Sequence, residues 1–319
     1  MTDTESAATG RERSRDAQEI GTIADRVLDN VAEVIVGHGE EIEHILTAMF
    51  GRGHVLLEDV PGVGKTMLSR AIAASFDSSF KRVQFTPDLL PSDVTGASVY
   101  NQQSQTFEFR PGPIFANVVL GDEINRAPPK TQSALLEAME EGQVTVDGET
   151  HALPRPFTVI ATQNTVERDR TYDLPMAELD RFTKKLGLGY PDEADESVML
   201  DRVVGTHPIE EAGPVASLDD LERARDVTAG VTVEAPIREY VTRLARYTRD
   251  RAELGASPRA SLQLLRAAQG RAVLNGREYV IPDDVQTEAR VVFPHRIRTG
   301  VEDTAEALLA EALESVPVE

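Results

Sequence analysis

The 319-residue chain contains no cysteine, which excludes disulfide bonds and thiolate metal ligands. Its six histidines are scattered. The two that are nearest in sequence, His38 and His44, lie six residues apart, and this spacing does not place both on one face of a helix. We therefore expect no metal site built on histidine.

Long apolar runs are also missing. No stretch approaches the ~18 consecutive apolar residues of a membrane-spanning helix. The first residues, MTDTESAATGRERSRDAQE, are polar and lack the apolar centre of a secretion signal. These absences predict a cytoplasmic protein without a membrane span. The length leaves room for two domains, and a 40% hydrophobic content is enough for a buried core.

Lysine is scarce, and arginine supplies 28 of the 33 basic residues. With 54 acidic residues the formal net charge is −21. An acidic, lysine-poor surface indicates a halophilic source, because concentrated salt screens the self-repulsion of such a surface. The same charge makes nucleic acid an unlikely partner. The five lysines are Lys65, Lys81, Lys130, Lys184 and Lys185.

The pattern along the chain predicts a disordered tail over residues 1–18, an α/β domain over 19–190 and a helical domain over 191–319. In the middle region five short apolar runs alternate with helical patterns. This arrangement is typical of a parallel sheet covered by helices on both faces. The runs are His54–Leu57, Arg82–Phe85, Asn117–Leu120, Phe157–Ala161 and Lys185–Leu188.

Two β-hairpins interrupt this alternation. The first spans residues 98–109, with a polar tip at 101–106 and three aromatic residues in its strands. The second spans residues 143–152 and turns at Asp147-Gly148, a dipeptide strongly associated with two-residue hairpin turns.

A strand, a glycine-containing loop and a helix start follow one another from Val55 to Thr66, which predicts a phosphate-binding loop. We expect Lys65 to contact the β- and γ-phosphates of ATP and the Thr66 hydroxyl to bind Mg²⁺. The full pattern has glycine at position 59, where this chain has Asp59. The predicted phosphate-binding residues are Pro61, Gly62, Val63, Gly64, Lys65 and Thr66.

Two later strands end in polar residues suited to hydrolysis. The run Val118–Leu120 leads to Asp122 and Glu123. We expect Asp122 to hold Mg²⁺ and Glu123 to orient and deprotonate the attacking water. The next strand ends at Asn164, whose amide could bond the γ-phosphate or that water.

With these residues in place, the chain from Val36-Gly37 to Arg296 resembles the MoxR family of AAA+ ATPases. The resemblance implies a P-loop AAA+ core, an αβα layer structure with a parallel five-stranded sheet, and a C-terminal all-α lid domain. The stretches that match best are residues 84–96, 121–129, 161–164, 179–182 and 257–260.

The resemblance also implies roles for residues outside the loop. Val36 and Gly37 are expected at the nucleotide. Arg181 resembles the arginine finger directed at the γ-phosphate of the next subunit, and Arg259 resembles the second sensor, which couples the lid to the nucleotide. Two further arginines compete for the finger role, and a threonine replaces the proline expected after the polar sensor. These three residues are Arg168, Arg170 and Thr165.

The family further implies a homo-oligomer, a hexameric ring with nucleotide between subunits. We expect an ATP-hydrolysing, chaperone-like motor that remodels or activates protein complexes, with von Willebrand factor A domain proteins as candidate partners. Three alternatives stay open: a nucleic-acid motor, a magnesium-chelatase-like motor subunit, and a nucleotide-gated scaffold with little turnover. The sequence names neither the client nor the ring size.

Overall fold

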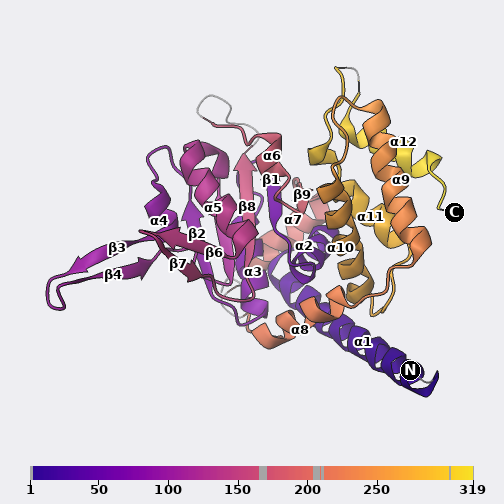
Figure 1. The fold of residues 1–319 in the computed structure, drawn as a ribbon, viewed down its shortest axis with the longest axis horizontal. Coiled ribbons are helices and arrows are strands. Elements are labelled where there is room, and N and C mark those ends of the chain that lie inside the picture. The colour runs from indigo at the N-terminus through magenta and orange to yellow at the C-terminus, as the bar shows by residue number, and fades with distance from the viewer. Residues whose placement is uncertain (1–2, 165–170, 204–208, 210–211, 302, 319) are drawn as a thin grey trace.

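The computed structural model describes residues 3–164, 171–203, 209, 212–301 and 303–318 (Figure 1). At its centre is a five-stranded sheet in the order β2-β5-β8-β1-β9, with every neighbouring pair parallel. The predicted parallel α/β sheet is confirmed. Its strands are β1 Val55–Asp59, β2 Phe80–Gln84, β5 Val118–Asp122, β8 Thr158–Asn164 and β9 Lys184–Leu186.

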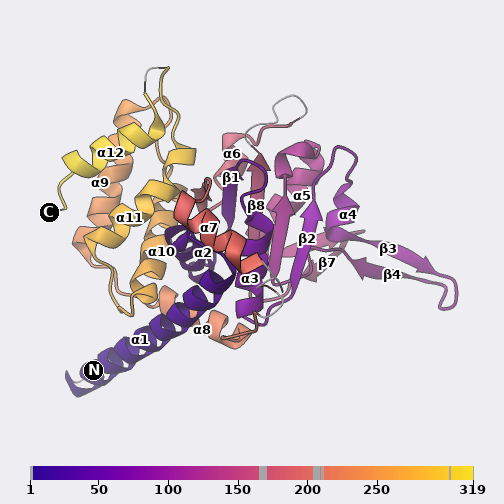
Figure 2. The same ribbon diagram turned by 180° about the vertical axis from the view of Figure 1, so that it is seen from behind.

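Helices cover both faces of the sheet, which explains why the central strands β1, β5 and β8 are mainly apolar before their carboxyl ends. Leu57 and Leu120 face the core formed with α1 (Asp3–Val34), α2 (Gly39–Phe50) and α3 (Lys65–Ser75). The alternate residues, such as Val119, face α5 (Pro129–Glu141) on the other side. Figures 1 and 2 show these two layers from opposite directions.

The first helix corrects the prediction of a disordered tail over residues 1–18, because α1 begins at Asp3. Its buried stripe runs from Ala17 to Val31 and packs on α3, α8 (Leu218–Ala229) and α10 (Pro258–Leu274). The residues before Ala17 are rich in alanine, glutamate and arginine, which favour helix and extend it ahead of the packed part.

Both predicted hairpins are present. They are β3 Gly96–Asn101 with β4 Thr106–Pro111, after the short α4 Pro91–Thr95, and β6 Gln143–Val146 with β7 Glu149–Ala152. Asp147 and Gly148 have φ of 51° and 85°, as the tight hairpin turn requires. The first hairpin projects from the body (Figure 1).

Aromatic contacts fix the base of this projecting hairpin and leave its outer part open. Phe109 stacks on His151 of the second hairpin with ring centroids 3.8 Å apart. Further out, Tyr100 and Phe107 contact only edge to face at 5.4 Å and are 49% and 73% exposed. The hairpin therefore presents two aromatic rings on a braced support.

After the sheet, helices predominate, as predicted. Gly270 of α10 lies so close to α2 that a Cβ there would come within 2.5 Å of the Thr47 carbonyl oxygen. No helix among the described residues is long and apolar enough to cross a membrane. The remaining helices are η1 Ile124–Arg126, α6 Met176–Leu179, α7 Glu193–Val203, α9 Ala235–Arg251, α11 Pro282–Val292, η3 Pro294–Arg296 and α12 Ala305–Ser315.

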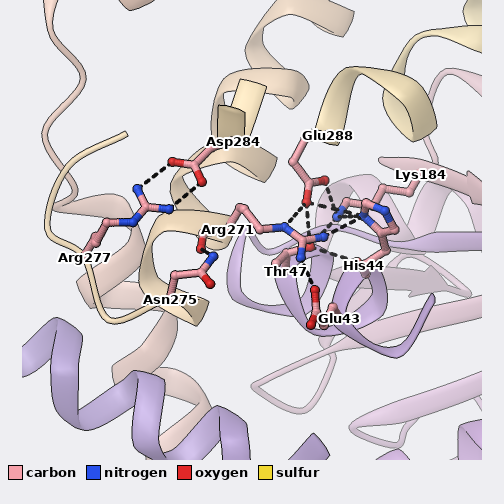
Figure 3. Close-up of polar contacts among 9 residues, drawn as sticks. All are labelled: Glu43, His44, Thr47, Lys184, Arg271, Asn275, Arg277, Asp284 and Glu288. Atoms are coloured by element: carbon pink, nitrogen blue, oxygen red, sulfur yellow. Dashed lines mark hydrogen bonds and ion pairs between the residues drawn. The ribbon is translucent and has the colours of Figure 1, made fainter. Parts of the chain in front are cut away.

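A buried group of charges fastens these helices to the sheet (Figure 3). Lys184 of β9 and Glu288 of α11 are both fully buried and form an ion pair. Arg271 of α10 donates from Nε to the same carboxylate at 2.9 Å, and its Nη2 lies 3.0 Å from Nδ1 of His44 in α2. Burial lowers the pKa of His44. One carboxylate thus joins four elements.

Candidate active site

The predicted phosphate loop lies between β1 and α3, at the carboxyl end of the sheet. Gly62 and Gly64 have φ of 90° and 91°, a region that side chains disfavour, and Lys65 begins α3. A Cβ at either glycine would meet no protein atom within 4 Å, so the loop backbone faces open space. A cradle of backbone N–H groups at a helix start suits a phosphate.

Lys65 lies beside this cradle. Its ammonium donates to the carbonyl oxygens of Asp59 and Val60, both at 3.1 Å. Burial lowers the pKa of Lys65, while the charges of nearby Asp59, Asp122 and Glu123 oppose that shift. The lysine and the predicted hydrolytic carboxylates are therefore close enough to act electrostatically on one another.

Asp122, at the end of β5, is held on both carboxylate oxygens. Arg82 of β2 donates to Oδ2 from Nε at 3.0 Å and from Nη2 at 2.5 Å. Thr162 of β8 donates to Oδ1 at 2.6 Å. The carboxylate is thus fixed in direction, with a guanidinium group on one oxygen and a hydroxyl group on the other.

Glu123 follows in the left-handed conformation, with φ of 55°. Its backbone N–H donates to the Thr162 hydroxyl at 2.9 Å. Its Oε2 accepts from Gln84 Nε2 and Arg126 Nη1, both at 2.7 Å. Both donors bind Oε2, so Oε1 is the oxygen that a water molecule would approach.

Asn164 ends β8 opposite Asp59 in the strand register and is 6% exposed. The carboxyl ends of three neighbouring strands thus bring the predicted lysine, carboxylates and amide to one edge of the sheet. No group of three or more His, Asp or Glu side chains that could hold a metal exists among the described residues. Thr66 and Asp122 still fit Mg²⁺, which usually keeps its waters and takes few protein ligands beside phosphate oxygens.

The cavity beside the loop has a volume of about 500 Å³, and most of the residues that line it are apolar. It is bounded by Val36, Gly62 and Gly64, and by Tyr190 and Met199 from the segment after β9. Gly37 lies next to it with φ of 72°, facing Asp195 of α7. The cavity suits a purine base attached to phosphates in the loop.

Asp59, the residue that departs from the loop pattern, bonds to the backbone of the segment after β9. Asp59 is 8% exposed, and its Oδ2 accepts the backbone N–H groups of Leu188 at 2.6 Å and Gly189 at 2.7 Å. Its Oδ1 accepts from Val60 at 2.7 Å. Glycine could make none of these bonds. Asp59 therefore ties the start of the phosphate loop to the segment that carries Tyr190 into the cavity.

We expect Asp59→Gly, which restores the usual loop pattern, to destabilise the protein by about 2 kcal/mol or more. The reason is that the buried N–H of Leu188 and the part-buried N–H of Gly189 lose their shared acceptor, and an unsatisfied buried group costs roughly 1–3 kcal/mol. Urea unfolding would measure this loss, with Asp173→Gly as the control, since Asp173 is exposed, has no positive φ and accepts no hydrogen bond among the described residues. Equal unfolding midpoints for parent and Asp59→Gly would refute the connecting role.

Arg181 and Arg259 lie near the amino ends of strands β1 and β9, whereas the phosphate loop lies at the carboxyl ends of the strands. Arg181 comes three residues before Lys184, which pairs with Val55 at the start of β1. Arg259, in the first turn of α10, donates to Glu140 at 2.5 Å, and Arg181 lies 3.5 Å from the other oxygen of that carboxylate. The predicted second sensor thus lies with the predicted finger and not with Lys65 of its own chain. The competitors Arg168 and Arg170, and Thr165, lie outside the described residues.

Sequence reasoning missed the residues that hold the two carboxylates. Arg82 and Gln84 are alternate residues of β2, so they project from the same face of the sheet, where they bond to Asp122 and Glu123. Thr162 belongs to a recognised stretch, yet its contacts to Asp122 and Glu123 depend on strand order. The sequence did contain one signal for Arg82 and Gln84: polar residues occupy alternate positions of β2, a strand that was expected to be buried.

Comparison with known proteins agrees with this geometry. Residues 54–184 match the family model described as ATPase family associated with various cellular activities (AAA), and residues 244–314 match the AAA lid domain. Fold and site together define an AAA+ ATPase.

The chain is 49% identical over 298 residues to the Bacillus subtilis protein YeaC, covering 93% of each. It is 41% identical over 292 residues to Chaperone MoxR1 of Mycobacterium tuberculosis, covering 88% of this chain and 77% of the relative. A crystal structure from Cytophaga hutchinsonii superposes with a TM-score of 0.89 at 36% identity, over 98% of both chains. The chain belongs to the MoxR family of AAA+ ATPases.

Proposed function

We propose that this chain is a magnesium-dependent ATPase that works as a ring of identical subunits, six in number, in the cytoplasm. The supporting observation is the division of the predicted site. The phosphate loop and the hydrolytic carboxylates lie at one edge of the sheet, and the arginine pair lies at the other. Two copies side by side would bring the halves together.

In the first half, the loop and Lys65 bind the β- and γ-phosphates of ATP. Thr66 and Asp122 would hold Mg²⁺, which when bound neutralises phosphate charge. Glu123 accepts a proton from the attacking water, and Asn164 orients that water or the γ-phosphate. Gln84 and Arg126 both donate to Oε2 of Glu123, so Oε1 is the oxygen that would accept the proton of the water.

In the second half, Arg181 places a cation against the charge that develops on the neighbour's γ-phosphate. Such fingers are worth roughly 10³–10⁵ in rate. Arg259 contributes a second cation from the lid helix α10, so the lid of one subunit senses the nucleotide of the next. This arrangement would transmit hydrolysis from subunit to subunit.

The work that this motor does is proposed to be chaperone-like remodelling of protein complexes. The relative named Chaperone MoxR1 supports this class of function. The exposed rings of Tyr100 and Phe107, on a hairpin braced at its base, suit contact with a protein client. A von Willebrand factor A domain protein is the proposed partner. The net charge of −21 disfavours nucleic acid as the client.

Subunit mixing tests the shared site. Arg181→Ala rings lack the finger and Glu123→Gln rings lack the base, so each alone should be nearly inactive. Mixed rings contain interfaces that pair an intact Glu123 with an intact Arg181, and we expect ATPase activity to reappear in them. Labelled subunits must be shown to exchange. No recovery at any mixing ratio, despite exchange, would place Arg181 in its own subunit's site.

A further inference from the structure

One carboxylate lies between the two predicted trans-acting arginines. Glu140, at the end of α5, accepts from Arg259 Nη2 on Oε1 at 2.5 Å, and its Oε2 lies 3.5 Å from Arg181 Nη1. Arg181 comes from the segment before β9, and Arg259 comes from the lid helix α10. A single side chain thus joins a core arginine to a lid arginine.

These three residues line a cavity of about 330 Å³ with two more arginines, Arg52 and Arg266. Glu140 is the only acid among the described residues that line it. Arg52 is paired with Asp226 and Glu222, which lie outside the lining, so Glu140 faces the charges of Arg181, Arg259 and Arg266. Without the carboxylate, Arg181 and Arg259 would repel one another, and nothing in the lining would hold them in one direction.

Stability alone does not account for this contact. The side chains of Glu140 and Arg259 are 40% and 41% exposed, and such exposed pairs contribute little to folding. Arg181 has a second acid at 3.5 Å, Glu178, which belongs to α6, the helix just before Arg181. The lid helix is also held near Arg181 by Gln263, which donates to the Asp180 carbonyl oxygen at 3.1 Å. Glu140 is the contact that sets the two guanidinium groups relative to one another.

We propose that Glu140 is a positioning residue for ATP hydrolysis: it holds Arg181 and Arg259 as a pair, directed at the phosphates bound by the adjacent subunit. The proposal rests on the proposed function. Glu140 does not touch the nucleotide of its own subunit, whose loop lies at the other edge of the sheet. Its loss misplaces the arginines and leaves ATP binding intact.

Glu140→Gln keeps the side-chain size and removes the charge. Because misplacing a catalytic group by about 1 Å can cost about 10²-fold, we expect kcat to fall by about ten- to a hundredfold. The KM for ATP, the melting temperature and the ring size should stay near the parent values. Glu141→Gln is the matched control, since Glu141 is the next residue, is exposed and has no ion pair among the described residues. If Glu140→Gln has the same kcat as the parent protein, the proposal is overturned.

Two further measurements separate positioning from a general structural role. In an Arg259→Ala background, Glu140→Gln should cost much less than in the parent, because its partner is already gone. Mixing Glu140→Gln with Glu123→Gln subunits should restore activity at interfaces with an intact base and an intact arginine pair. An equal loss in both backgrounds, or no recovery in exchanging rings, overturns the proposal.

Failure of this inference differs from failure of the proposed function. If Arg181→Ala and Arg259→Ala both hydrolyse ATP at the parent rate, the shared site itself is wrong. If both are slow while Glu140→Gln is not, the shared site stands and Glu140 has no part in it.

Discussion

Replacement of Glu123 by glutamine is expected to reduce ATP hydrolysis by about 10²–10⁴-fold while ATP still binds. The amide keeps the shape of the side chain and can still accept a hydrogen bond from Gln84. It cannot take a proton from water. Phosphate release measures the first effect, and titration with a fluorescent ATP analogue measures the second.

Two variants show whether the loss is specific. Glu137→Gln, an exposed position on α5 without an ion pair among the described residues, should hydrolyse ATP like the parent. Lys65→Ala should instead lose nucleotide affinity, because its ammonium lies against the start of the loop, at the carbonyl oxygens of Asp59 and Val60. If Glu123→Gln releases phosphate at the parent rate, the base must be sought elsewhere.

The sequence was most informative where one local rule decides the structure. Five short apolar runs predicted five strands, and the rule that a strand buried on both faces is mainly apolar applies best to the central strands β1, β5 and β8. Asp147-Gly148 predicted its hairpin, because both turn residues need positive φ. Residues at the carboxyl ends of parallel strands could be grouped in advance, since those ends meet at one edge of the sheet.

The sequence was least informative where contacts join distant segments. In the sequence Asp59 was only a departure from the loop pattern. Its role depends on Leu188 and Gly189, which follow β9 and lie beside it only in the folded chain. Arg259 was predicted to couple the lid to the nucleotide. The carboxylate that it contacts, Glu140, is 119 residues away in the sequence and could not be predicted. The helix before Ala17 was missed because a polar stretch without an apolar stripe gives no periodic signal. The halophilic source stays a prediction.

The group of charges under the lid leads to the second large effect (Figure 3). Burial alone would raise the pKa of Glu288, but the charge of Lys184, the hydrogen bond from His44 and the charge of Arg271 together lower it to about 2. The folded pKa is below the ordinary value of 4.5. The stabilisation from this carboxylate is therefore complete above pH 4.5 and is lost as the pH falls toward 2.

We expect Glu288→Gln to destabilise the fold by about 3–5 kcal/mol, since Lys184 and Arg271 are then left buried without their shared anion. The midpoint of urea unfolding, monitored by circular dichroism, measures the change. As a control, Glu239→Gln breaks a solvent-exposed pair with Arg243 and should cost about 1 kcal/mol or less.

Removal of both charges provides the sharper comparison. In Lys184→Met with Glu288→Leu, the buried cation and the buried anion disappear together, and Arg271 keeps its ion pair with Glu43. This double variant should be more stable than Glu288→Gln, because replacing a whole buried pair with apolar groups costs less than leaving one charge alone. A double variant that is less stable than Glu288→Gln would mean that the pair contributes through its own attraction, and the lid would then be fastened by the ion pair itself.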